Sequence, residues 1–454
     1  MNWLKKQIFN LPCSVASNKE DLFILTLIVL TSISFSLIWT YVSCIFVLAI
    51  ILVIGGGLVS FKRPEWFLYF IATSRISLDA IKLFYYNALD VGMHYSLSLD
   101  GIITALFLFC ALKYFTKKRD LKFNLPGVKA YIFFLLICFI SLSISLDKIV
   151  GIRYIIHYLE YFFIYIFGVN ALDSRQKNYK MIIAVLISAL IPLTIGFYQA
   201  ITLRGDFSTL GFNRIYATTP HPNAYAFYLM VMLIFSFTLY LYSSSLRKKI
   251  SLFFFAIAIL LSLILTYTRG AWFGAFLGLT ILLLSTFKRN DAFLSLVIII
   301  LLIVMSGFFF PRIPYRLFEL TDSWRWRMRV WMINFEKFLR RPLIGYGIGS
   351  SNIIGKQKTG YVVSPHNDYL RLMVEMGLLG FCAFLAVVFS LLRFYLWHYR
   401  HSLEYRKRVF ALGLIVVILS SLFMQFGDNL HHYDMVFTYF WFFVVIGYTL
   451  ITES

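Results

Sequence analysis

Cysteine is scarce in this sequence, with five residues in a chain of 454. Cys13 lies in a polar N-terminal segment, and the other four lie singly within apolar runs, so no C-x-x-C or C-x-x-H pair is present. A zinc site or a disulfide framework requires paired or clustered cysteines. We therefore predict neither, and interpret the cysteines as small apolar packing residues.

Charge is also scarce, since only 14% of the residues are charged, whereas about 25% is usual for a soluble domain. Hydrophobic residues make up 60% of the chain, and the mean hydropathy is +0.79. Apolar runs of about 18 residues or more recur, and each could cross a hydrocarbon core as a helix that satisfies its own backbone hydrogen bonds. The composition predicts an all-α, polytopic integral membrane protein.

We expect one transmembrane domain over residues 1–454, with about 12 to 14 helices and no separate soluble domain. The apolar run after the polar, basic N-terminus lacks a small-residue cleavage pattern, so we expect a retained anchor. The predicted spans are 21–38, 41–60, 65–82, 98–115, 128–145, 150–172, 180–201, 223–243, 250–267, 270–287, 292–310, 369–393, 408–426 and 434–451.

Basic residues alternate along the predicted loops, and this predicts a topology. With the N-terminus placed inside, every inside loop is basic, including "KYFTKKRDLKFN", "SSLRKK" and "RFYLWHYRHSLEYRKR". Both termini are then cytoplasmic. The net charge of +21 is spread over many short loops instead of one stripe, so it requires no nucleic-acid partner.

Residues 311–368 form the only long predicted loop, on the outer side, and loops of this length are usually functional. Within it we expect a basic amphipathic helix at the membrane interface, ended by Pro342. Gly345, Gly347 and Gly349 are expected to form a flexible turn after this helix. The apolar stripe of the predicted helix comprises Trp324, Met328, Trp331, Phe335 and Phe338.

Ionisable residues gather at the outer ends of the predicted helices. Arg214 and Arg269 offer guanidinium forks that match phosphate oxygens, and could neutralise a diphosphate leaving group. His366 could accept a proton from a hydroxyl as a general base, oriented by Asp368 or Asn367. Carboxylates in the outer loops are few and scattered, so we predict a site without a metal or another cofactor.

Each of these residues also has a structural interpretation. His366, in "SPHND", could simply begin a helix; Arg269 could anchor the interface; Arg214 could pair with Asp206; and His221 could shape a turn between two prolines. The sixth predicted span carries Arg153, His157 and Glu160 on one helical face. They could pair between helices or line the same cavity. We interpret His431, His432 and Asp434 as a solvated turn at the interface.

Three segments, in this order and spacing, resemble the superfamily of O-antigen ligases and O-antigen polymerases: "TRGAWFGAFLGL", "RMRVWMINFEKFLRRPLIGYGIG" and "HNDYLRLMVEMGLLGF". The resemblance covers about residues 205–385. It implies that His366 is the catalytic histidine, that Arg214 and Arg269 are the essential arginines, and that Arg327 is the loop arginine. A serine usually precedes "RGAW" in these proteins, whereas this chain has Thr268.

The resemblance also implies a fold of the GT-C type and an activity. Such proteins are inverting glycosyltransferases of the bacterial inner membrane. They act at its periplasmic face on glycans carried by undecaprenyl diphosphate. A ligase moves the glycan to lipid A-core, which is the activity we favour; a polymerase moves it to a second lipid-linked repeat. A flippase for lipid-linked oligosaccharide is the remaining alternative, and it should carry polar groups at mid-membrane depth. Membrane lipids are expected partners, with Arg327, Asn367, Asp368, His221 and Arg153 as possible substrate or lipid contacts.

Overall fold

The computed structural model describes residues 63–89, 99–118, 120–207, 213–287, 322–360 and 364–453, together with Gly55. These residues are mostly helical, with one short antiparallel ribbon of β1 (Asp206–Phe207) and β2 (Asn213–Arg214). The predicted spans at 21–38, 41–60 and 292–310 lie outside the described residues. The first part of the predicted long loop, residues 311–321, lies outside them as well.

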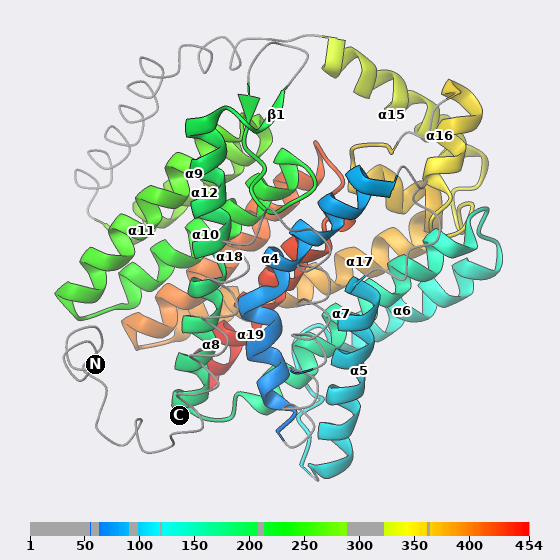
Figure 1. Cartoon of the computed structure of the whole chain (residues 1–454). Helices are drawn as coiled ribbons and strands as arrows, with labels where there is room; N and C mark the ends of the chain where they lie inside the picture. The colour runs from blue at the N-terminus through cyan, green and yellow to red at the C-terminus, as the bar shows by residue number, and fades with distance from the viewer. Residues whose placement is uncertain are drawn as a thin grey trace.

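The other predicted spans are all helices, and Figure 1 shows their order along the chain. The span predicted at 180–201 is divided at Ala189 into two helices. The helices are α4 (Glu65–Leu89), α5 (Leu99–Lys117), α6 (Val128–Ser143), α7 (Lys148–Ala171), α8 (Arg175–Ser188), α9 (Leu190–Thr202), α10 (Pro222–Tyr242), α11 (Leu246–Leu265), α12 (Arg269–Thr286), α15 (Asp322–Arg340), α16 (Ser351–Thr359), α17 (Asp368–His401), α18 (Tyr405–Gln425), the 3₁₀ turn η2 (Leu430–His432) and α19 (Asp434–Thr452).

Within the described ranges, eight helical segments are long and apolar enough to cross a membrane. They are α7, α8 and α9 taken together as Arg175–Thr202, α10, α11, α12, α17, α18 and α19. The prediction of an all-α polytopic membrane protein is therefore confirmed. The helix α6 is apolar but shorter.

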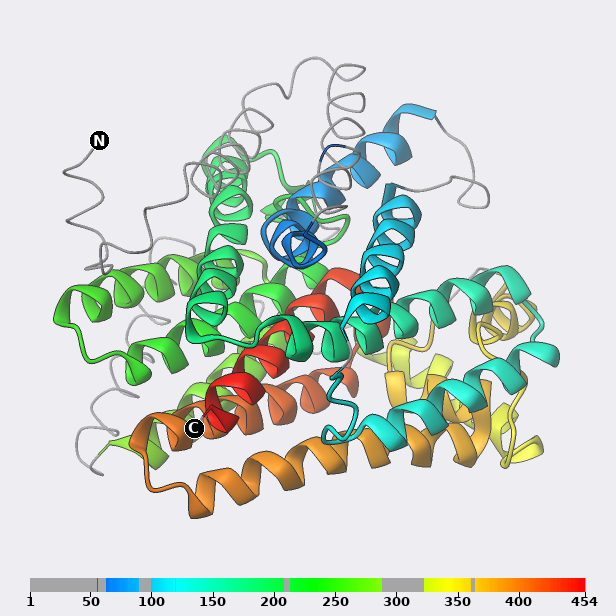
Figure 2. The ribbon, with the colours of Figure 1, turned by 90° about the horizontal axis from the view of Figure 1, so that it is seen from below.

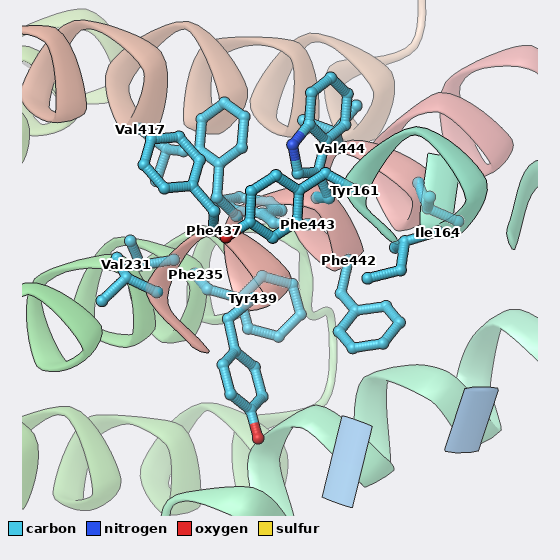
Figure 3. Packing of buried hydrophobic residues seen from close by; sticks show 14 of the residues in the cluster. Tyr161, Ile164, Val231, Phe235, Val417, Phe437, Tyr439, Phe442, Phe443 and Val444 are labelled. Carbon is cyan, nitrogen blue, oxygen red and sulfur yellow. The ribbon is translucent and has the colours of Figure 1, made fainter. Parts of the chain in front are cut away.

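Helices α10, α18 and α19 form the centre of the bundle, and their side chains are mostly buried (Figures 1 and 2). Aromatic rings fill the space between them. Phe235 of α10 meets Phe443 of α19 edge to face at 4.7 Å, and Tyr161 of α7 lies 5.7 Å from Phe437 (Figure 3). Such ring pairs add to the burial of apolar area. The outer helices α6, α11 and α12 instead expose many apolar side chains, as lipid-facing helices do.

The basic loops gather at one end of the bundle. Asn178 at the start of α8 donates to the Glu453 carboxylate at the end of α19, and Lys407 at the start of α18 donates to the Glu453 carbonyl. Lys118, after α5, donates to the carbonyl of Asn170 at the end of α7. The starts of α10, α12, α17 and α19 therefore lie at the opposite end, where β1 and α15 are also found, along the upper edge of Figure 1.

Two glycine positions shape this second end. Gly377 has φ +64 and divides α17 into two helical parts; a Cβ there would lie 2.2 Å from the backbone of Leu343. The turn with Gly345, Gly347 and Gly349 is tightly packed, since a Cβ on Gly347 would lie 2.2 Å from Ser145 and its N–H donates to the Glu375 carbonyl. The prediction of a flexible turn is therefore wrong: positive φ values and close backbone approach explain these glycines.

Candidate active site

His366 stands immediately before α17 and pairs with a carboxylate from another part of the chain. Its Nδ1 lies 3.1 Å from Oδ1 of Asp428, in the loop between α18 and η2. A carboxylate at Nδ1 favours the tautomer with the proton on that atom, which leaves the Nε2 lone pair available. The side chain of Asp428 is 4% exposed, whereas that of His366 is 37% exposed. The imidazole can therefore meet a ligand while its carboxylate stays protected.

Asp428 is held from both sides. Its Oδ1 also accepts from the backbone N–H of Asn429 at 2.8 Å, and its Oδ2 accepts from Nδ2 of Asn223 at 2.6 Å. Burial alone would raise the pKa of Asp428, but the hydrogen bond and charge of His366, together with the charge of Arg327, lower it to about 2. The carboxylate is therefore ionised at neutral pH and can stabilise an imidazolium on His366.

The network continues from Asn223 to Arg214 of β2. Nη2 of Arg214 donates to Oδ1 of Asn223 at 2.8 Å and to the Thr268 hydroxyl at 3.0 Å, and Nε donates to the Thr266 carbonyl at 2.9 Å. These bonds fix the plane of a half-buried guanidinium. A continuous chain of hydrogen bonds thus joins His366, through Asp428 and Asn223, to Arg214.

Arg269 is the first residue of α12, next to the Thr268 that contacts Arg214. Its side chain is partly buried. The first N–H groups of a helix point along its axis, out of its N-terminal end, and carry a partial positive charge, which favours anions. Arg269 therefore stands at a helix start that lies beside the guanidinium of Arg214.

The helix α15 contacts both loops of the His366–Asp428 pair. Nη1 of Arg327 donates to the Gly427 carbonyl at 2.7 Å, directly before Asp428. Nε1 of Trp331 donates to the Pro365 carbonyl at 2.8 Å, directly before His366. The arginine of the long loop thus lies beside the site.

Unusual backbone geometry concentrates here. Four non-glycine residues in the described part of the chain have positive φ, namely Leu203, Ala217, Tyr267 and His366. His366 has φ +50, Tyr267 directly precedes Thr268, and Ala217 lies in the loop between β2 and α10. Each such conformation costs about 1–3 kcal/mol and persists only where the surroundings enforce it. Such strain is often found at functional sites, which is consistent with a functional site around His366.

The expected orienting role of Asp368 and Asn367 is wrong in this structure. Asp368 is completely buried, and its oxygens accept from Nε of Arg371 and from the backbone N–H of His431. Asn367 is also buried, and its Oδ1 caps α17 by accepting from the N–H of Leu370. Both side chains bond to neighbouring parts of the protein, and their contact with a substrate or lipid stays a prediction.

His221 shapes a turn, which confirms its structural interpretation. It is the N-cap of α10, and its Nδ1 accepts from the N–H of Asn223 at 3.1 Å. Desolvation, followed by the charge of Arg214, lowers the pKa of His221, so the ring is neutral at pH 7. His221 thus holds Asn223 from the backbone side, while the Asn223 side chain joins Asp428 to Arg214.

The charged face predicted on α7 is split. Arg153 is exposed, whereas Glu160 is fully buried and accepts from the Thr104 hydroxyl at 2.9 Å. His157 lies 3.9 Å from both Glu160 and Asp434, and Asp434 pairs with the buried Arg75. Arg153 therefore lies apart from these pairs.

The solvated turn expected at the start of α19 is wrong. His431 and Asp434 are each 5% exposed. Burial, followed by the charge of Arg371, lowers the pKa of His432 to about 3, so its ring is neutral. This turn, which follows Asp428 in the sequence, is therefore packed inside the protein.

The sequence did not predict three residues of the hydrogen-bond network, namely Asp428, Asn223 and Thr268. His366 and Asp428 are separated by 62 positions, and Asn223 and Asp428 by 205. No spacing rule relates residues at such distances. The available signal was composition, since Asp428 is a carboxylate in a short outer loop of a chain with few acidic residues.

Comparison with known proteins supports one class of membrane protein for part of the chain. Residues 253–385 match the family model described as "O-Antigen ligase", which confirms the resemblance over that region. A 78-residue alignment is 31% identical to a protein of Rickettsia prowazekii named "Putative polysaccharide ligase", and a second is 28% identical to a protein of the same name from Rickettsia conorii.

Each alignment covers 15% of this chain, and the chain matches about a fifth (19%) of the length of each relative. The family match includes Arg269, Arg327 and His366, whereas Arg214, Asn223 and Asp428 lie outside it. The hydrogen-bond network thus joins the matched region to segments on either side of it.

Proposed function

We propose that this protein is a membrane glycosyltransferase that transfers a glycan from a lipid diphosphate to a sugar hydroxyl, acting as a polysaccharide ligase. The observation that carries the proposal is the hydrogen-bond chain from His366 through Asp428 and Asn223 to Arg214. One end of this chain suits proton abstraction and the other suits an anionic leaving group. The match to the O-antigen ligase family supports the same reaction class.

In the proposed reaction, His366 is the general base. Its Nε2 takes the proton of the acceptor hydroxyl, and the oxygen forms a bond to the anomeric carbon of the donor from the face opposite the leaving group. The bond between that carbon and the diphosphate oxygen breaks, and its electron pair leaves with the diphosphate. Asp428 holds the ring through Nδ1 and balances the imidazolium charge. General-base groups typically contribute about 10²- to 10⁴-fold in rate.

Arg214 and Arg269 would stabilise the charge that develops on the diphosphate. A guanidinium whose plane is fixed in advance needs no reorganisation when that charge appears. The first amides of α12 would add a favourable dipole. Because two arginines and a helix start supply this charge, we propose that the reaction needs no metal ion.

The donor we propose is a glycan on undecaprenyl diphosphate, and the acceptor we propose is lipid A-core. The inner membrane would then hold the protein with its basic loops in the cytoplasm and His366 at the periplasmic face, by the positive-inside rule. The polar site at one end of the bundle and the basic loops at the other support this orientation.

The test compares surface glycans from a strain lacking the protein with those from strains complemented by wild type, His366→Ala or His401→Ala. His401 is an exposed histidine at the opposite end of α17, and it serves as the matched control. We expect wild type and His401→Ala to restore long glycans on lipid A, and His366→Ala to leave them on the lipid carrier. Lipid A bearing a single repeat would instead indicate a polymerase. Full restoration by His366→Ala would overturn the base assignment and favour a flippase.

A further inference from the structure

The helix α15 presents two different apolar faces. Val330, Trp331 and Phe338 face the protein, and Phe338 packs on Leu370 and Val374 of α17. A second stripe carries Met328, Met332, Phe335 and Leu339, which recur at steps of four, three and four and are 41%, 64%, 50% and 60% exposed. The described part of the chain therefore leaves much of this outer stripe uncovered.

The outer stripe of α15 continues into surfaces that face lipid elsewhere on the protein. Leu343 and Ile344 lie just beyond the helix, after Arg341 and Pro342, and are more than half exposed. Leu343 contacts the bend of α17 at Gly377, and the next residues, Leu378 and Leu379, are exposed as well. Exposed apolar residues therefore extend from α15 to a membrane-spanning helix.

Beside the stripe, α15 carries a polar flank. Arg325 and Arg329 are exposed there, and Arg340 pairs with Glu336. A basic strip next to an apolar stripe matches a bilayer surface with anionic headgroups above acyl chains. A soluble partner would not require continuity with a transmembrane surface.

We propose that α15 rests on the membrane surface through Met328, Met332, Phe335 and Leu339, and that from this seat it positions the His366–Asp428 pair. The side of α15 that faces the protein provides the two hydrogen bonds, from Trp331 to Pro365 and from Arg327 to Gly427. These carbonyls directly precede His366 and Asp428 in the sequence. Trp331 is thus a positioning residue, and the bilayer is part of the framework that sets the site. The positioning role of Trp331 rests on the proposed glycan transfer. The contact of α15 with the membrane surface, here called the lipid seat, does not.

The lipid seat is tested in a variant whose five native cysteines are replaced and which carries one new cysteine. One probe is placed by Met332→Cys on the outer stripe, and its control by Arg329→Cys on the polar flank. Each is labelled with a small fluorophore in nanodiscs containing phosphatidylglycerol. We expect lipids brominated in the acyl chain to quench the probe at 332 at least twofold more than the probe at 329. Equal quenching at the two positions, or none at 332, would overturn the seat.

The positioning role is tested by Trp331→Phe, with Trp326→Phe as the control on an exposed residue of the same helix. Phenylalanine keeps a ring against Phe426, which lies 5.3 Å away, and removes only the N–H donor. We expect kcat to fall about tenfold with KM and the melting temperature unchanged. An unchanged kcat, or an equal fall in Trp326→Phe, would contradict the role. If wild type transfers no glycan, the proposed function fails, while the quenching result still decides the seat.

Discussion

Two groups of ionisable side chains lie side by side at the start of α17 and differ in their exposure to solvent. His366 and Asp428 form a pair in which the imidazole is 37% exposed. Asp368, Arg371 and Glu375 form a cluster in which every side chain is completely buried. His366 and Asp368 are two residues apart in the sequence, yet one faces outward and the other inward.

The buried group of Asp368, Arg371 and Glu375, here called the closed cluster, satisfies its charges internally, whereas the partly exposed His366–Asp428 pair is called the open pair. Arg371 donates to Asp368 at 3.1 Å, to Glu375 at 3.3 Å and to the Tyr158 hydroxyl at 3.1 Å, and Ser351 donates to Glu375. In the open pair, Nε2 of His366 has no partner among the described residues. A satisfied buried network fixes geometry, whereas an accessible lone pair can do chemistry. The comparison shows how one short segment, "HNDYLRLMVE", supplies both the reactive group and its support.

The largest expected effect separates chemistry from folding at the open pair. We expect His366→Ala to lower glycan transfer by about 10³-fold, within the usual range for a general base. The purified protein in detergent should stay folded, with a melting temperature lowered by a few degrees at most, because only the pairing with Asp428 is lost. The assay follows glycan transfer from a lipid diphosphate donor, with His401→Ala as the active control. Retention of more than a tenth of the wild-type rate would sink the assignment.

The closed cluster should show the reverse pattern. Arg371→Met removes the cation and leaves two buried carboxylates without a cationic partner, which should cost about 3–5 kcal/mol of stability. We expect a large loss of folded protein by size-exclusion chromatography after extraction. The triple variant Asp368→Asn, Arg371→Met, Glu375→Gln should recover most of it, since no uncompensated charge remains. If Arg371→Met alone were as stable as wild type, the cluster would not be the support inferred here.

The difference between the two groups also marks what the sequence could predict. Long apolar runs predicted the spans closely, as at 223–243 for α10 (Pro222–Tyr242), because hydrophobicity alone selects residues that cross a membrane. The motif around His366 predicted the candidate base. The carboxylate that pairs with His366 could not be predicted. Asp368 is nearer in sequence but faces the interior, whereas the partner, Asp428, lies in the loop after α18.

The burial of polar residues is a second feature that the sequence does not predict. "HHYD" at residues 431–434 has the composition of a solvated turn, yet it is packed between Arg75, Tyr154 and the rings of α17 and α19. A polar segment can be buried wherever tertiary partners satisfy it, and those partners are set by the packing of the helices. Local sequence does not contain that information.

A smaller effect should come from the hydroxyl that links Arg214 to α12. Thr268→Val keeps the shape of the side chain but removes the acceptor of the 3.0 Å bond from Arg214. A lost hydrogen bond to a charged group is worth about 1.5 kcal/mol, so transfer should fall about tenfold. Thr268→Ser keeps the hydroxyl and should remain within about twofold of wild type. Equal rates for the valine and serine variants would show that this bond does not contribute to the reaction.

An effect of similar size is a pH dependence of stability at Asp428. Its pKa is lowered from 3.8 to about 2 in the folded protein, because the interactions with His366 and Arg327 outweigh burial. A lowered folded-state pKa contributes stability above the unfolded value, and that stability is lost as pH falls through the folded value. Ionisation of Asp428 should therefore contribute about 2 kcal/mol near neutral pH and progressively less between about pH 4 and pH 2.

The measurement is the difference in melting temperature between wild type and Asp428→Asn across this range. We expect the difference to be constant from pH 7 to about pH 5 and to shrink below pH 4, because the carboxylate then becomes neutral like the amide. Lys407→Gln, at the opposite end of the bundle, controls for general acid effects. A difference that stays constant down to pH 2.5 would mean that the ionised carboxylate does not stabilise the loop. The site would then depend on the shape of Asp428 alone, and its charge would matter only during the reaction.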